Sequence, residues 1–493
     1  MPTQPLPDNP SLENLRKQAK SLRKAVRAND SDALASVREF HPRADEAFKN
    51  FSLAAAQLVI ARSHAFASWS KLKQHLQTVE EYSWSVPPEA PDADDPRAIA
   101  DRFVRLACLT YAGDHTKRRD RARELLAAHP SISGENIYTA VTIGDVAAVQ
   151  SMLEANPELA KLRGGPNNWE PLLYAAYSRL NSEADGHSTL EVARLLLKHG
   201  ADPNAGFLWE GNYLFTALTG AFGEGEGGAV HQPEHQYCYQ LARRLLESGA
   251  DPNDSQTLYN RMFTGGTRHL ELLHEFGLGK GGGGVWFRRL GAQLGTPSEF
   301  LAQQMCWAAK YNQKDRLRWL VEHGVDVNRP DTRFRRTPYE MALLHGNMEI
   351  AQYLLDHGAT ETQLNDLEAF SAACITADAA RARSLLAKDA TLVDRLGDER
   401  AELLNLAAEG DKRDAVRLMA ELHFDLNQVK RTTPLHLAAM SGHLDMVKLL
   451  IELGADPLIR DTEFNARPLG WAKYSDQTAV AELLEQFEPR TSE

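Results

Sequence analysis

The sequence predicts an all-α protein built as a solenoid, in which similar helix-turn-helix units stack one after another. Two observations lead to this fold class. Residues 433–461 contain two helical stretches, the first opened by Thr433-Pro434 and the second closed by Gly454. Gly454 also belongs to a series of helix-ending positions that recurs along the chain. One unit of this size cannot bury its apolar faces alone, so neighbouring copies are required.

Each marker in residues 433–461 has a physical role. Thr433 is a typical N-cap residue, and Pro434 suits the first helical position, where a missing N–H has no cost. Gly442 and Gly454 can take the left-handed conformation that ends a helix. The segment TPLHLAAMSGHLDMVKLLIELGADPLIRD resembles an ankyrin repeat. This resemblance implies paired short helices and the binding of other proteins.

The helix-ending positions recur at a regular distance. From Gly324 onward the steps are 34, 31, 34 and 31 residues. Weaker copies around Asn156 and His129 extend the series backward, so we expect about ten or eleven units between residues 98 and 488. The remaining positions of the series are Gly200, Gly249, Gly277, Gly358, Asp389, His423 and Gly454.

A small helical module is expected over residues 1–80, ahead of the solenoid. Ser11 is predicted to cap a helix that reaches about residue 28, and further helices are predicted over 31–39, from Ser52, and from Ser70 to about residue 79. The segment AQLVIARSHAFASWSKLKQHL resembles an N-terminal helical module of bacterial ankyrin-repeat proteins. Residues 81–97 are acidic and rich in proline, which predicts a linker before a solenoid over 98–488.

Charge and cysteine content limit the classes of partner. A net charge of −12 argues against nucleic acid. The helix over residues 11–28 is basic, so it could make a weak contact with an acidic partner, although a solvated face of a packed helix is the preferred interpretation. The four cysteines lie far apart, which is typical of reduced thiols in a cytoplasmic protein. No signal peptide or membrane span is predicted.

Three inserts interrupt the regular spacing, at residues 181–188, 223–234 and 280–296. Inserts in repeat proteins are usually surface loops, and they often lie on a binding face. We therefore expect a scaffold that binds another protein on the concave, insert-bearing face. Tyrosine, tryptophan and arginine are the best anchors for a protein partner. The predicted partner-binding residues are Trp169, Tyr174, Tyr177, Arg179, Trp209, Glu224, Glu226, His231, His235, Tyr259, Arg261 and Trp286.

The same inserts allow an alternative, in which an enzyme or a site for a small molecule or metal is built around them. His235 and Cys238 would share one face of a helix that begins near Pro233, and His231 precedes them. This spacing lacks a second pair of ligands, so no metal or other cofactor is predicted. The glycine-rich residues 277–282 follow no predicted strand and do not predict a nucleotide site. No catalytic residues are predicted.

Overall fold

The computed structural model describes residues 6, 10–87, 95–181 and 184–489. Residues 88–94 of the predicted linker and 182–183 of the first predicted insert lie outside this part of the chain. The chain forms two compact units, residues 1–304 and 305–493. Within the described ranges, no helix is both long enough and apolar enough to cross a membrane.

Five helices open the first unit. Ser11 acts as the predicted N-cap, and Ser52 caps the helix predicted to start near it, since their hydroxyl oxygens accept the backbone N–H of Asn14 and Ala55 at 3.4 and 3.1 Å. The apolar stripe of α1 is buried and packs against α4. One short helix, α3, was not predicted. The helices are α1 (Leu12–Arg27), α2 (Ser31–Phe40), α3 (Ala44–Lys49), α4 (Leu53–Ser63) and α5 (Trp69–Tyr82).

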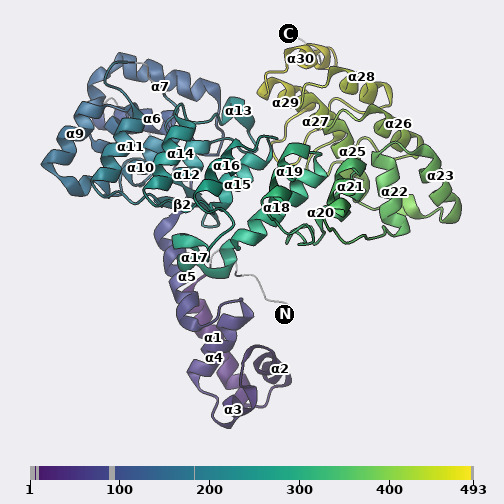
Figure 1. Ribbon diagram of the computed structural model, residues 1–493, viewed down its shortest axis with the longest axis horizontal. Coiled ribbons are helices and arrows are strands. Elements are labelled where there is room, and N and C mark those ends of the chain that lie inside the picture. Colours follow the sequence, from purple (N-terminus) through teal and green to yellow (C-terminus); the bar gives the residue numbers. More distant parts are fainter. Residues whose placement is uncertain (1–5, 7–9, 88–94, 182–183, 490–493) are drawn as a thin grey trace. The chain divides into compact units, whose positions relative to one another are not determined.

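Paired helices follow in the first unit, and Figure 1 shows the pairs side by side. Successive first helices α8, α10, α12 and α15 contact one another, as a stack of repeats requires. Their bounds are α6 (Pro96–Ala107), α7 (Thr116–Ala128), η1 (Pro130–Gly134), α8 (Ile137–Ile143), α9 (Val146–Ala155), η2 (Pro157–Ala160), α10 (Pro171–Tyr177), α11 (Thr189–Lys198), α12 (Ala217–Phe222), α14 (Cys238–Glu247), α15 (Ser255–Met262) and α16 (Arg268–Glu275).

A three-stranded sheet, which was not predicted, joins the N-terminal helices to the repeats. The strands are β1 (Ser83–Trp84), β2 (Gly206–Trp209) and β3 (Tyr213–Thr216). β2 and β3 form an antiparallel hairpin between two repeats, and β1 adds to it in parallel with Ser83 opposite Leu208. Trp84 is buried. The first residues of the predicted linker are therefore part of the packed first unit.

Two of the predicted inserts contain helices. The insert over residues 223–234 contains α13 (Gly228–His231), and the insert over 280–296 contains α17 (Gly284–Leu290) and η3 (Gly291–Leu294). α17 packs against α5, and the buried side chains of Trp286 and Leu290 join Leu208 and Leu214 in one apolar cluster. The expectation of a surface loop at residues 280–296 is wrong, because this insert covers the apolar side of the hairpin.

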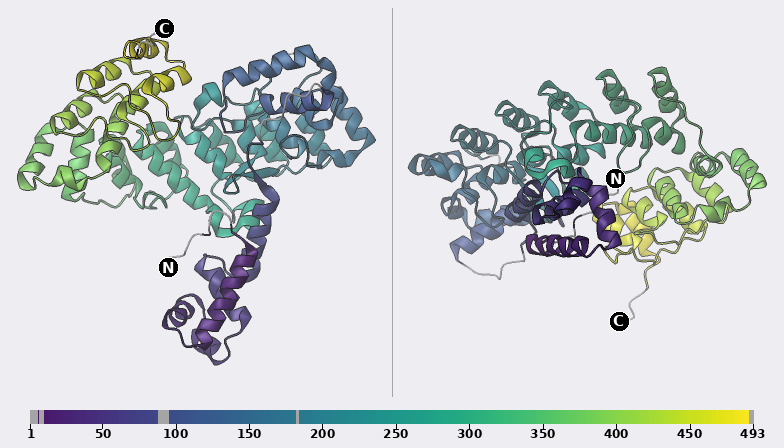
Figure 2. Two further views of the ribbon diagram at one scale, coloured as in Figure 1. Left: turned by 180° about the vertical axis from the view of Figure 1, so that it is seen from behind. Right: turned by 90° about the horizontal axis from the view of Figure 1, so that it is seen from below.

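The second unit holds five further complete pairs, which follow one another in Figure 2. Pro434 opens a first helix, as the sequence predicts, and Pro338 and Pro468 open two others in the same way. α18 (Pro297–Lys310) begins in the first unit and ends in the second. The others are α19 (Lys314–Glu322), α20 (Pro338–Leu344), α21 (Met348–Asp356), α22 (Asp366–Ile375), α23 (Ala379–Lys388), α24 (Leu392–Arg395), α25 (Glu399–Glu409), α26 (Arg413–Glu421), α27 (Pro434–Met440), α28 (Leu444–Glu452), α29 (Pro468–Tyr474) and α30 (Thr478–Glu485).

Candidate functional site

Most of the predicted site residues lie inside the first unit. Three of the twelve reach the surface: Glu226 is exposed, whereas Trp209 and Tyr259 are half-buried. The expectation that Trp169 and Trp286 would be exposed is wrong, since they are 1% and 3% exposed. The buried set is Trp169, Tyr174, Tyr177, Arg179, Glu224, His231, His235, Arg261 and Trp286.

Arg179 joins two first helices and an insert. Its guanidinium is fully buried and donates to the carbonyl oxygens of Ala176 and Ser178 at the end of α10, at 3.0 and 2.9 Å. It also donates to Gly220 of α12 at 2.6 Å and to Pro233 of the insert at 2.8 Å. The last carbonyls of a helix lack partners within the helix and carry partial negative charge, so a cation suits this position. Arg179 is therefore a structural residue and does not face a partner.

An aromatic cluster explains why three other predicted anchors are buried. Trp169 stacks on Phe207 of β2 with ring centroids 4.5 Å apart, and it lies 5.2 Å from the ring of Tyr177. The hydroxyl of Tyr177 donates to the carbonyl of Thr216 at 2.9 Å. The hydroxyl of Tyr174 donates to the carbonyl of Gly164 at 2.8 Å. Phe207 of the hairpin, which the sequence did not predict, covers Trp169 and Tyr177, whereas Tyr174 packs against Trp169 and Tyr138.

A buried ion-pair network fastens the insert over residues 223–234 to α15. One terminal nitrogen of Arg261, Nη1, lies 2.8 Å from Glu224 Oε1 and 2.7 Å from Glu234 Oε1. Burial lowers the pKa of Arg261, but the two carboxylates raise it by more, so the guanidinium stays charged. The hydroxyl of Thr264 donates to the second oxygen of Glu224 at 3.2 Å. Because Glu224 is buried and paired, it cannot serve as an exposed ligand for a cationic group.

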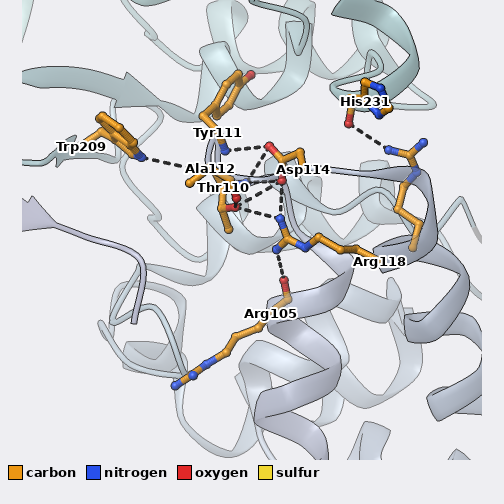
Figure 3. Close-up of polar contacts among 9 residues, drawn as sticks. Arg105, Thr110, Tyr111, Ala112, Asp114, Arg118, Trp209 and His231 are labelled. Atoms are coloured by element: carbon orange, nitrogen blue, oxygen red, sulfur yellow. Dashed lines mark hydrogen bonds and ion pairs between the residues drawn. The ribbon is translucent and has the colours of Figure 1, made fainter. Parts of the chain in front are cut away.

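The loop over residues 108–115, between α6 and α7, is held together by Asp114 and contacts Trp209 of β2 (Figure 3). The Asp114 carboxylate accepts the backbone N–H of Thr110 and of Tyr111 at 3.1 and 2.7 Å, and it pairs with Arg118 at 2.5 Å. The indole N–H of Trp209 donates to the carbonyl of Thr110 at 3.2 Å. The sequence analysis did not select this loop, although its Tyr-Ala-Gly-Asp segment is a turn signal between two helices.

Arg119 of α7 extends the contact to the end of α13. Its guanidinium donates to the carbonyls of His231 at 3.0 Å and Val230 at 2.9 Å. Asp114, Arg118, Arg119, Arg179 and His231 contribute to the lining of a cavity of about 10 Å³. This volume corresponds to about one water molecule. The cavity is therefore too small for an organic substrate.

The side chains that were considered and rejected as metal ligands have other roles. α14 begins at Cys238, so the expected helix face shared by His235 and Cys238 does not form. His235 Nδ1 accepts the backbone N–H of Tyr237 at 3.1 Å, and its Nε2 lies 2.9 Å from the hydroxyl of Thr189. Burial lowers the pKa of His235 well below its ordinary value, so the ring is neutral. Among the described residues, no group of three or more His, Cys, Asp and Glu side chains is placed to hold a metal ion.

The four cysteines are all buried. Burial raises the pKa of each thiol to about 12. A thiol with this pKa is protonated at neutral pH and is a poor nucleophile. Cys108, Cys238, Cys306 and Cys374 are thus structural side chains.

A small patch of the insert and of α15 reaches the surface, and we call Glu226, Val230, Tyr259 and Phe263 the rim patch. The hydroxyl of Tyr259 donates to Glu226 Oε1 at 2.5 Å, and its ring meets the edge of Phe263 at 5.3 Å. Val230 is 53% exposed and Phe263 is 36% exposed. The patch combines an aromatic edge, an exposed carboxylate and a fastened backbone.

Comparisons with known proteins agree with the paired helices. Three family models match parts of the chain. The model described as "Ankyrin repeat" matches residues 167–206, the model described as "Ankyrin repeats (many copies)" matches residues 305–355, and the model described as "Ankyrin repeats (3 copies)" matches residues 369–461. Palmitoyltransferase AKR1 of Lachancea kluyveri is 30% identical over 164 residues, which is 30% of this chain and 21% of that protein. Rabankyrin-5 of Mus musculus is 24% identical over 155 residues, which is 30% of this chain and 13% of that protein.

Palmitoyltransferase Hip14 of Drosophila melanogaster is 40% identical over 74 residues, covering 14% of this chain and 12% of that protein. The chain therefore spans about a fifth or less of these curated relatives. Ankyrin repeats support a role in protein–protein interaction. The eleven helical pairs in the described residues and the three matched segments show that this chain is an all-α ankyrin-repeat solenoid.

Proposed function

We propose that this protein is a cytoplasmic scaffold that binds another protein on the insert-bearing face of its first unit. The rim patch is the contact surface in this proposal. The main support for this proposal is that ion pairs from Arg261 and hydrogen bonds from Arg119 bind the insert to its neighbours. These contacts hold the rim patch in one conformation before a partner binds. A surface fixed in advance loses little conformational entropy on binding, so more of the contact energy remains as affinity.

The composition of the rim patch also favours a protein partner. Tyr259 and Phe263 supply rigid aromatic surface at a low entropic cost, and Glu226 provides a polar neighbour to them. The named activities of the palmitoyltransferase relatives belong to those proteins, of which this chain spans about a fifth or less. The resemblance of residues 1–80 to a bacterial N-terminal module, and the independence of these residues as a domain, remain predictions.

The proposal is tested with the full chain as bait in native cell extract. Mass spectrometry identifies the captured protein, and biolayer interferometry with that purified partner measures its affinity. A Tyr259→Ala, Phe263→Ala double variant should bind the partner at least about tenfold more weakly, because it loses the aromatic anchors. Leu162→Ala is the matched control, since Leu162 is 53% exposed and lies outside the patch.

The control should keep wild-type affinity, and both variants should keep wild-type circular dichroism. Equal affinity of the double variant and the wild type would place the binding surface elsewhere. If no protein is reproducibly captured by the wild-type chain, the scaffold function itself is wrong.

A further inference from the structure

A cluster of cations and aromatic rings lies at the end of α18, within the second unit. The amine of Lys310 lies 5.0 Å from the ring centroid of Tyr311 and 5.3 Å from that of Phe334. The ring of Trp307 lies 4.3 Å from that of Tyr311, and the Arg333 guanidinium lies 5.5 Å from Phe334. Lys310 and the three rings are half-buried, whereas Arg333 is exposed. The cluster thus reaches solvent from a partly enclosed position.

Two later repeats add a second lysine and a histidine. Lys412, just after α25, donates its amine to the carbonyl of His345, just after α20, at 3.5 Å. Burial together with the charges of Lys310 and Lys412 lowers the pKa of His345 to about 3. The ring is therefore neutral at pH 7. Asn347 of the same turn donates its side-chain amide to the carbonyls of Ala309 and Lys310 at 2.7 and 2.9 Å, so this turn contacts both lysine segments. We call Lys310, Lys412 and Arg333 the cationic cluster.

The cationic cluster differs from several other charged groups of this unit. Basic side chains in those groups pair with carboxylates across neighbouring repeats, as Lys314 does with Glu349 and Arg383 with Glu421. Within the described residues, no carboxylate forms an ion pair with the side chains of Lys310, Arg333 or Lys412. Residues 305–493 carry 23 Lys and Arg against 31 Asp and Glu, so these cations gather on a chain segment with a net charge of −8.

The lowered pKa values of Lys310 and Lys412 also distinguish these lysines from exposed, paired ones. Burial lowers the pKa of Lys310, although the charges of Glu409 and Glu402 oppose that effect, and burial lowers the pKa of Lys412. Both amines have therefore lost hydration, and among the described residues neither lies within ion-pair distance of a carboxylate, although the charge of Glu409 acts on Lys310. A carboxylate brought to this place would restore the missing interaction.

We propose that the cationic cluster binds an acidic segment of a partner protein, with carboxylates on Lys310, Arg333 and Lys412 and an apolar side chain against Trp307 and Tyr311. This inference rests on the proposed role in protein binding and names the partner chemistry for a second surface. Carboxylates accept strong charge-assisted hydrogen bonds from lysine and arginine. The net charge of −8 disfavours a long polyanion such as nucleic acid, which would meet repulsion beyond the cluster.

The test uses the full chain and a fluorescein-labelled peptide of repeated Glu-Glu-Tyr units, with binding followed by fluorescence anisotropy. Lys310→Ala and Lys412→Ala should each weaken binding about tenfold, since each removes one charge-assisted contact. Lys388→Ala is the matched control, because Lys388 is exposed on α23 and makes no ion pair with the described residues. A peptide of repeated Lys-Lys-Tyr units should not bind the wild-type chain.

The expected pattern is loss with the two cluster variants, no change with Lys388→Ala and no change with the rim-patch double variant. Equal peptide affinity of the wild type and both cluster variants would overturn the inference. Tighter binding of a single-stranded oligonucleotide than of the acidic peptide would also overturn it. Neither result would contradict the proposed scaffold function, because that function is tested separately, by capture of the native partner and by the affinity of the rim-patch double variant.

Discussion

Replacement of Arg179 by alanine should destabilise the first unit by about 3–5 kcal/mol. The change removes four hydrogen bonds, to the carbonyls of Ala176, Ser178, Gly220 and Pro233. A hydrogen bond from a charged donor contributes about 1.5–3 kcal/mol, so four such bonds amount to about 6–12 kcal/mol. The cost of burying the guanidinium, several kcal/mol, offsets part of this sum.

The effect can be measured by urea unfolding followed by circular dichroism, together with amide hydrogen exchange. Faster exchange should appear in residues 217–222 and 228–235, because Arg179 holds the end of α12 and the insert together. Arg194→Ala is the control. Its side chain is 47% exposed and, among the described residues, pairs only with Glu191, so its loss should change stability by less than about 1 kcal/mol.

A second variant separates charge from geometry. Arg179→Lys keeps the positive charge, but a single amine cannot reach all four carbonyls, so about 1–3 kcal/mol should still be lost. If Arg179→Ala stays within about 1 kcal/mol of the wild type and leaves the exchange of residues 217–235 unchanged, the structural role assigned to Arg179 is refuted.

Three further predictions concern packing and pH. Leu450→Ala should cost about 2–5 kcal/mol in urea unfolding, because this side chain is fully buried in α28, whereas Leu453→Ala, 38% exposed, should cost much less. His345 has a lowered pKa of about 3, so the second unit should lose stability as pH falls from 6.5 toward 3, and His345→Gln should flatten that slope by about 1.4 kcal/mol per pH unit. Burial and Asp202 raise the pKa of Glu170 from 4.5 to about 7, so the first unit should lose stability as pH rises from about 4.5 to about 7, and Glu170→Gln should stabilise it at pH 8. An unchanged pH profile in either variant contradicts the assigned environment.

The repeat architecture could be predicted because residues close together in the sequence mark the ends of its helices. Thr433, Pro434, Gly442 and Gly454 mark helix ends by their own backbone and side-chain chemistry, and each lies where the sequence predicts. The regular spacing then allows the weaker copies to be identified as repeats. Such signals need no knowledge of distant parts of the chain.

The site could not be predicted in the same way, because its geometry depends on residues far apart in the sequence. Trp169 is buried by Phe207 of the hairpin, and Arg179 is enclosed by Gly220 and Pro233. Tyrosine, tryptophan and arginine suit both a binding surface and a packed interior, so residue type alone does not separate the two roles. Phe263, which does reach the surface, follows α15 without any local signal.

The addition of β1 to the hairpin has a consequence for folding kinetics. Ordinary solenoids fold quickly because most of their contacts are local in sequence. Here Ser83 pairs with Leu208, and the ring of His75 hydrogen-bonds the carbonyl of Leu290, 215 residues away. Each contact closes a large loop, whose entropy must be lost before the contact stabilises the chain. The first unit should therefore fold more slowly than the second, and its repeats should unfold together instead of fraying one by one from the end.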